Sequence, residues 1–195
     1  MPTSIEFAQR LREKFGGLLS EPAEFRGEVT LTVTDPDRIA EVCREAKEGC
    51  GFDMLLDLTG VDHYGNEPRW SVVYELYGVG HGVHLRLKTS VGEAVSEVPT
   101  VSGVWRGAEW HEREAYDMLG IRFRGHPDLR RILMWEGYPY FPLRKDFPLA
   151  GKNSEVPDVA FTRPAPLEGG PFVTVAGGQD SIVREPRART PQGVD

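Results

Sequence analysis

The sequence predicts an α+β fold: a mixed, mostly antiparallel sheet of about four strands that is covered by helices on one face. Two observations favour this class. Apolar residues recur at helical spacing in three segments and follow strand patterns in four others, and two of these strands are joined by a short glycine-rich turn. The order helix, strand, helix, three strands and helix, with short links between strands, is typical of an antiparallel arrangement rather than of alternating β-α-β units.

The first third of the chain predicts helix, strand and helix. A capping box opens segment 3–18, and apolar residues at helical spacing follow it. Segment 28–33 alternates with period two, as a half-buried strand does. Asp35 suits an N-cap and Pro36 the first position of a second helix, which should end near Gly49.

Three strands and a third helix follow. Segment 52–58 is short and mostly apolar, which predicts a buried strand, and segments 70–77 and 83–88 predict two more that form a hairpin. Apolar residues resume helical spacing at 105–119, and a glycine is placed to end that helix. The residues after it, 121–127, alternate briefly and then turn.

The third helix carries an unusual density of charge. Glu109, Arg113 and Asp117 stand four residues apart, a spacing that favours ion pairs along the helix. Large apolar residues crowd beside them, which a helix that only covers a core does not require. We therefore expect these charged groups to face another protein.

Two parts of different character are predicted. Residues 1–133 should form an α/β globular domain, and residues 134–195 an extended arm that packs on a partner subunit. Twelve of the 45 residues from 151 to 195 are proline or glycine, with little periodicity. Such a segment cannot bury enough apolar surface to fold alone.

Composition limits the possible partners and location. The formal net charge is −7, which disfavours nonspecific binding to nucleic acid or anionic lipid, yet segment 122–145 holds six basic residues and two acidic ones and predicts a local basic patch. No apolar run approaches the roughly 20 residues needed to cross a bilayer. The absence of a secretory signal favours the cytoplasm. Cys43 and Cys50 are expected to be reduced thiols.

The residue patterns argue against a self-contained active site. Segment 111–115 is similar to a zinc-hydrolase helix, but the second histidine that this motif needs is replaced by alanine. Glu112 and Glu114 stand two residues apart on a helix and point in different directions, so structural ion pairing is expected rather than acid and base chemistry. His126 is expected to bond to the backbone of a turn, with proton transfer as the alternative.

The basic residues leave two interpretations open. Arg130, Arg131, Arg144 and Lys145 have the chemistry to bind phosphates, which would make the chain a phosphate-binding or nucleic-acid-binding module. Carboxylates on another protein fit an acidic chain better. Segment 142–149 supports the second interpretation, because two prolines are expected to hold it extended with a charged centre between apolar anchors.

Three stretches, 112–121, 125–133 and 142–148, closely resemble the C subunit (30 kDa subunit family) of bacterial respiratory complex I, the NADH-quinone oxidoreductase. The resemblance is specific across residues 99–149, although this chain inserts residues 138–141 before Pro142. It identifies a set of subunit-interface residues. They are Glu112, Arg113, Glu114, Tyr116, Asp117, Gly120, Gly125, His126, Pro127, Asp128, Leu129, Arg130, Arg131, Pro142, Leu143, Arg144, Lys145 and Asp146.

The resemblance implies a cofactor-free, hydrophilic subunit of the peripheral arm. Its main partner would be the large quinone-site D subunit, with the B subunit and other peripheral-arm subunits nearby and no nucleic acid. NADH, FMN, iron-sulfur clusters and quinone would belong to the parent proton-translocating complex. The chain would lie on the cytoplasmic side of the inner membrane and reach it only through the complex. Alternatives are the equivalent subunit of a related membrane-bound hydrogenase or dehydrogenase and, from another class, a small hydrolase using His111, Glu112 and Glu114.

Overall fold

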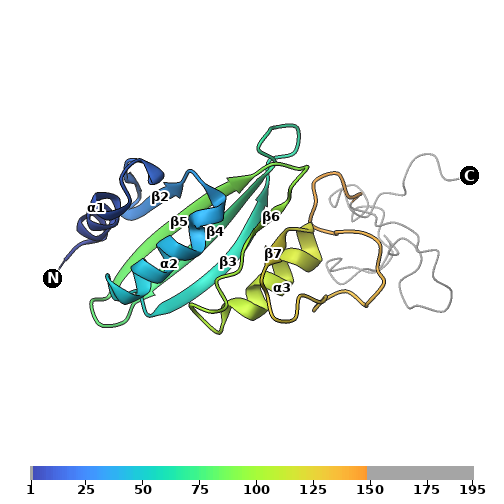
Figure 1. Cartoon of the computed structure of the whole chain (residues 1–195). Coiled ribbons are helices and arrows are strands. Elements are labelled where there is room, and N and C mark those ends of the chain that lie inside the picture. Colours follow the sequence, from blue (N-terminus) through green and yellow to red (C-terminus); the bar gives the residue numbers. More distant parts are fainter. Residues whose placement is uncertain (1, 149–195) are drawn as a thin grey trace, which may run out of the picture. The chain divides into compact units, whose positions relative to one another are not determined.

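The computed structural model describes residues 2–148 (Figure 1). The chain divides after Glu136: residues up to that point form one compact unit, and Gly137 begins a second. Most of the predicted arm, residues 149–195, lies outside the described residues. The division at 133/134 and the arm therefore stay predictions.

The larger unit contains a five-stranded mixed sheet. Its strands are β1 (Ala23–Phe25), β2 (Glu28–Val33), β3 (Met54–Asp62), β4 (Trp70–Gly78) and β5 (Val83–Val91), in the order β1-β2-β5-β4-β3. Every neighbouring pair is antiparallel except β2 and β5, which are parallel. The predicted α+β class, with a mostly antiparallel sheet, is confirmed. Sequence reasoning missed β1, because its three exposed residues show no strand pattern.

One face of the sheet is mainly apolar and the other is mainly polar. Residues that are paired across β2, β5, β4 and β3 form rows on each face. A row on the buried face is Leu31, Leu87, Tyr74 and Leu58, and the next row, on the opposite face, is Thr30, Arg86, Glu75 and Asp57. The alternation in the sequence therefore decides which face is covered.

Three α-helices accompany the sheet: α1 (Ser4–Phe15), α2 (Ile39–Glu48) and α3 (Ala108–Leu119). In Figure 1, α2 lies across the sheet; α1 contacts β2, and α3 contacts β3. The capping box at Thr3 is confirmed. The second helix begins later than predicted, because Pro36–Arg38 forms a 3₁₀ turn before α2 starts. The Asp35 carboxylate caps this turn by accepting the Asp37 N–H.

Strand β3 corrects one prediction. It extends to Asp62 and lies at the edge of the sheet, where Met54 and Leu56 are exposed, so it is not a fully buried strand. A short apolar run does not show whether one or both of its faces are covered. A second, small sheet pairs β6 (Glu97–Pro99) with β7 (Arg122–Arg124) in parallel. The sequence predicted only β7, as an extended segment.

Candidate functional site

Helix α3 organises the candidate site, and its position depends on a glycine in β3. A Cβ atom at Gly60 would lie 2.5 Å from Leu119 Cδ1 and 2.7 Å from Ile121 Cδ1. The absence of a side chain lets the end of the helix pack closely against the strand. The helix then ends at Gly120, whose φ of 80° is the left-handed conformation that glycine adopts without strain, as the sequence predicted.

Glu112 points from α3 into the interior and is completely buried. Its carboxylate accepts hydrogen bonds from the Val101 N–H at 2.7 Å and from the Thr100 hydroxyl, so it ties the helix to the segment after β6. Burial raises the pKa of Glu112 to about 7, although these two hydrogen bonds act in the opposite direction. The sequence suggested an exposed side chain at Glu112, but it is enclosed by its own chain.

His126 completes the environment of Glu112. Its Nδ1 accepts the Asp128 N–H at 3.0 Å, which places the ring proton on Nε2, and Nε2 lies 3.2 Å from the Glu109 carbonyl oxygen. The Glu112 carboxylate is 3.8 Å from the same Nε2. The predicted histidine bonded to a turn backbone is therefore confirmed.

Asp117, five residues after Glu112, is also completely buried but has different partners. Its Oδ2 accepts three consecutive backbone N–H groups, those of residues 132, 133 and 134, at 3.0, 2.7 and 2.8 Å. Its Oδ1 lies 2.5 Å from Nη1 of Arg131. Burial alone would raise the pKa of Asp117, but the three N–H groups and the guanidinium outweigh it, and the pKa is lowered.

Arg113 binds the same segment from one helical turn earlier. Its Nε donates to the Arg130 carbonyl oxygen and its Nη2 to the Arg131 carbonyl oxygen, both at 3.0 Å. Its guanidinium also lies 5.2 Å from the centre of the Trp110 ring. The predicted ion pairs along the helix are wrong here, since Arg113 and Asp117 use their polar atoms on residues 130–134 instead.

Half of the basic residues in the predicted patch form ion pairs within the chain. Arg124 pairs with Asp37 at 2.6 Å, Arg130 pairs with Asp128 at 2.8 Å, and Arg131 pairs with Asp117. Asp37 and Asp117 lie outside segment 122–145, and Asp128 lies within it. Three of the six basic residues of the predicted local patch are thus paired within the chain, which a count of charges along the sequence cannot show.

The structure separates the candidate interface residues by exposure. Glu112 and Asp117 are buried and cannot contact a partner in this conformation, whereas several others are exposed. The exposed candidates are Glu114, Gly125, Pro127, Asp128, Arg130, Leu143, Lys145 and Asp146. Sequence reasoning missed Trp110, whose side chain is 61% exposed on the same helix face as Arg113. Its spacing of three residues from Arg113 was the available signal.

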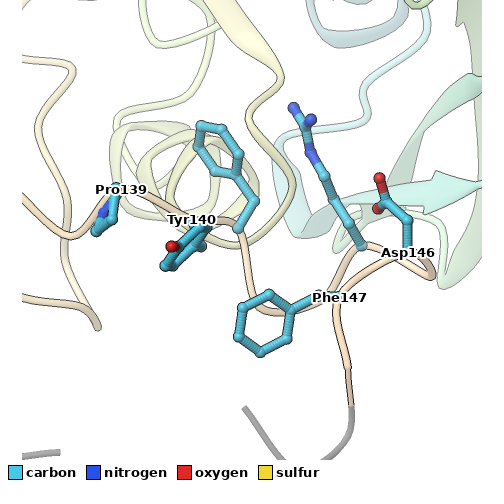
Figure 2. A pocket seen from close by; sticks show the side chains of 6 residues that line it. Pro139, Tyr140, Asp146 and Phe147 are labelled. Atoms are coloured by element: carbon cyan, nitrogen blue, oxygen red, sulfur yellow. The ribbon is translucent and has the colours of Figure 1, made fainter. Parts of the chain in front are cut away.

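The described part of the second unit contains an aromatic cluster (Figure 2). The Tyr140 and Phe147 rings lie 6.1 Å apart, and the Arg144 guanidinium lies 4.3 Å from the centre of the Phe141 ring. These four residues, with Pro139 and Asp146, line a hollow of about 240 Å³. The backbone makes two successive turns here, with Arg144 N–H bonded to Phe141 and Phe147 N–H to Arg144. The extended conformation predicted for 142–149 is therefore wrong for the described residues 142–148.

Two further features bear on the type of site. In the part of the chain that the structure describes, no group of three or more His, Cys, Asp or Glu side chains has the arrangement of a metal site. No helix among residues 2–148 is both long and apolar enough to cross a membrane.

Comparison with known families decides the membership of the chain. The family model of the respiratory-chain NADH dehydrogenase 30 kDa subunit matches residues 32–153. This range includes strands β3, β4 and β5, helix α3 and the aromatic cluster. The chain belongs to this family. The resemblance that the three sequence stretches carry is thus confirmed.

Several members of the family are close relatives. The NADH-quinone oxidoreductase C subunit 2 of Rhizobium etli is 46% identical over 160 residues, covering 81% of this chain and 84% of that protein. The protein of the same name in Rhizobium meliloti is 48% identical and covers 79% and 85%. The NADH-quinone oxidoreductase C subunit of Geobacter sulfurreducens is 46% identical, with coverage of 75% and 90%.

Two of the solved structures that match illustrate the shared fold. One is Nqo5 in a trypsin-resistant fragment (1–134), with a TM-score of 0.55, 30% identity and coverage of 62% of this chain and 95% of that one. The other belongs to the membrane-bound sulfane sulfur reductase, an archaeal respiratory membrane complex. It gives a TM-score of 0.64 at 27% identity and covers 73% of this chain and 84% of that one.

Proposed function

We propose that this chain is the 30 kDa-type C subunit of a proton-translocating NADH-quinone oxidoreductase, where it serves as a cofactor-free scaffold in the peripheral arm. It docks the large quinone-site D subunit and supports electron transfer from NADH to quinone without catalysing a step itself. The observation that carries this proposal is the family match over residues 32–153, together with C-subunit relatives at 46–48% identity.

The chemistry of the site favours docking over catalysis. Glu112, Asp117 and His126 are the groups best suited to acid, base or ligand chemistry, and all three are engaged by hydrogen bonds within the chain. The exposed groups nearby are Trp110, Arg130 and Leu133. Tryptophan and arginine are the types that contribute most to protein interfaces. The small hydrolase alternative therefore loses Glu112, which is buried and accepts hydrogen bonds from its own chain.

The remaining components follow from this assignment. The B subunit and neighbouring peripheral-arm subunits would lie close to the chain, and NADH, FMN, iron-sulfur clusters and quinone would stay on other subunits. The chain would be held at the cytoplasmic side of the inner membrane only through the complex.

Affinity capture tests this assignment directly. The tagged full-length chain, recovered from gently solubilised native membranes, is expected to bring down the quinone-site D subunit and the B subunit. Recovery of neither would overturn the proposal.

Arg144→Ala tests whether the second unit contributes to docking. The substitution should reduce recovery of the quinone-site subunit several-fold while changing the urea midpoint of the isolated chain little, because a side chain at an interface matters most when the partner desolvates it. Arg26→Ala is the matched control, since Arg26 also lies over a neighbouring phenylalanine ring, at 5.1 Å, but in the turn after β1. Equal losses of stability and recovery for Arg144→Ala would contradict the docking role.

The similarity to the sulfane sulfur reductase chain favours a second candidate, the equivalent subunit of a related membrane-bound hydrogenase or dehydrogenase. The same capture separates the two, because the recovered partners would include a hydrogenase-type or other redox module in place of the NADH-oxidising subunits. The nucleic-acid alternative is weakened by the internal pairing of Arg124, Arg130 and Arg131. Salt-sensitive binding of nucleic acid by the isolated chain would revive it.

A further inference from the structure

We infer that Asp117 and Arg113 are positioning residues that lock the backbone of residues 130–134 onto α3, and that this lock fixes the orientation in which the segment meets the partner subunit. The inference about the partner rests on the proposed docking function. The lock itself, defined here as the contacts of Asp117 and Arg113 with residues 130–134, is a property of the isolated chain and is tested separately.

The segment has no regular secondary structure to hold it. Residues 130–134 belong to no helix or strand, so their backbone groups have no ladder of neighbours. Two side chains of α3 replace that ladder. Arg113 binds the carbonyl oxygens of residues 130 and 131, and Asp117 binds the N–H groups of residues 132, 133 and 134. Five consecutive residues are thus fixed by two side chains one helical turn apart.

The geometry of the Asp117 contacts shows that the backbone conformation of the segment is specific. Three consecutive N–H groups point at one oxygen, an arrangement that makes a concave anion-binding site from the main chain. Arg131 adds its charge on the other oxygen and also donates to the Asp117 carbonyl oxygen at 3.0 Å. A buried ion pair can often be replaced by apolar side chains, but here that would leave three main-chain N–H groups without acceptors.

The lock leaves one large apolar side chain facing outward. The Leu133 N–H is bound at 2.7 Å, whereas its side chain is 63% exposed. An exposed side chain on an anchored backbone has little main-chain entropy to lose when a partner binds. The lock therefore provides preorganisation for docking, in addition to its contribution to folding.

Limited trypsin digestion of the full-length chain tests the lock. Trypsin should cleave slowly after Arg130 and Arg131, because their carbonyl groups are held by Arg113, and the turn at Arg26 provides an internal reference. In Asp117→Asn, which puts an amide donor in place of one carboxylate oxygen, cleavage after Arg130 and Arg131 should rise at least tenfold relative to cleavage after Arg26. Glu109→Gln, on the same helix, is the control and should leave the ratio unchanged.

The outcomes are distinguishable. An unchanged ratio in folded Asp117→Asn would overturn the lock. If cleavage rises at every site, the chain has unfolded, and the Arg113→Lys variant then decides. Lysine keeps the positive charge and leaves the Asp117 contacts in place, but it lacks the guanidinium that binds the carbonyl groups of residues 130 and 131. A selective rise after residues 130 and 131 in Arg113→Lys supports the lock, and no selective rise overturns it.

Affinity capture then tests the positioning role. Recovery of the quinone-site subunit by Asp117→Asn should fall about tenfold, while Glu109→Gln recovers the amount that the native chain does. If Asp117→Asn opens the segment to trypsin yet recovers as much partner as the native chain, the positioning role is overturned and the docking function stands. If the native chain itself recovers no partner, the docking function fails. The lock is still tested by the ratio of trypsin cleavage after Arg130 and Arg131 to cleavage after Arg26.

Discussion

Glu112 and Asp117 are two carboxylic acids on one helix, both completely buried, yet their pKa values are displaced in opposite directions. Glu112 receives hydrogen bonds from one hydroxyl and one backbone N–H, which do not compensate for its burial. Asp117 receives three backbone N–H groups and a guanidinium, which do. Both side chains are equally buried, so the number of hydrogen-bond donors decides the direction of the pKa shift. Asp117, with more donors, is the one that is ionised at neutral pH without a large penalty.

The two residues consequently stabilise the fold over different pH ranges. A carboxyl group whose pKa is lowered by folding contributes stability above its ordinary pKa of about 3.9 and loses it as the pH falls through the folded value. Asp117 is of this kind. Glu112 is of the opposite kind, because folding favours its protonated form, and its contribution is lost as the pH rises.

The largest expected effect is on stability when each carboxylate is removed. Asp117→Ala should lower the free energy of unfolding by about 3–5 kcal/mol, because it removes the carboxylate that pairs with Arg131 and leaves three main-chain N–H groups without their acceptor. Glu112→Ala should cost less at pH 7.5, since it also removes a carboxylate that burial penalises. Urea unfolding at that pH measures both, and equal losses would show that the donors around Asp117 do not distinguish the two sites.

The second effect is a pH dependence that belongs to Glu112. Moving the pKa of a carboxyl group from 4.5 to about 7 corresponds to about 3 kcal/mol at 1.36 kcal/mol per pH unit. The chain should therefore lose up to this amount of stability as the pH rises from about 4.5 to 8, with most of the change below pH 7. The dependence should be largely absent in Glu112→Gln, whose amide does not titrate.

Urea midpoints of the native chain and Glu112→Gln at pH 5 and pH 8 measure this dependence. Asp117→Asn is the informative comparison, because its pH dependence between these values should match that of the native chain. A native profile that Glu112→Gln fails to flatten would assign the titration to another group.

The contrast between the two sites also shows how far the sequence alone determines this structure. Period-two alternation correctly predicted β2, the glycine-rich turn between two strand-like segments predicted the β4–β5 hairpin, and the capping signals predicted where α1 begins and α3 ends. These features depend on neighbours in the sequence. The small sheet was only half predicted. Strand β6 has three residues and no pattern of its own, and it pairs with a strand more than twenty residues later.

The candidate site was harder to predict for the same reason. The sequence marked Glu112, Arg113 and Asp117 as unusual but assigned their charges to a partner. Their actual partners are Thr100, Val101 and residues 130–134, which lie 11 to 18 positions away along the chain. Helical spacing shows which residues share a face, whereas it does not show which loop returns to that face. The inward direction of Glu112 was nevertheless visible, because it follows Ala108 and precedes Ala115 on the buried stripe.

The smallest expected effect comes from Gly60 in β3, which packs against the C-terminal end of α3. In Gly60→Ala the added methyl group would meet the terminal methyl groups of Leu119 and Ile121, which are buried and have to move. Overpacking of this kind costs about 1–3 kcal/mol, and the lower end is expected because both contacts are the ends of flexible side chains. Leu119 lies two residues after Asp117, so the strain should reach the lock before it reaches Glu112. Gly60→Ala should therefore raise trypsin cleavage after Arg131 modestly and leave the Glu112-dependent pH profile unchanged. A change in the pH profile without a change in cleavage would show that the strain reaches Glu112 and not the lock, which would contradict the prediction.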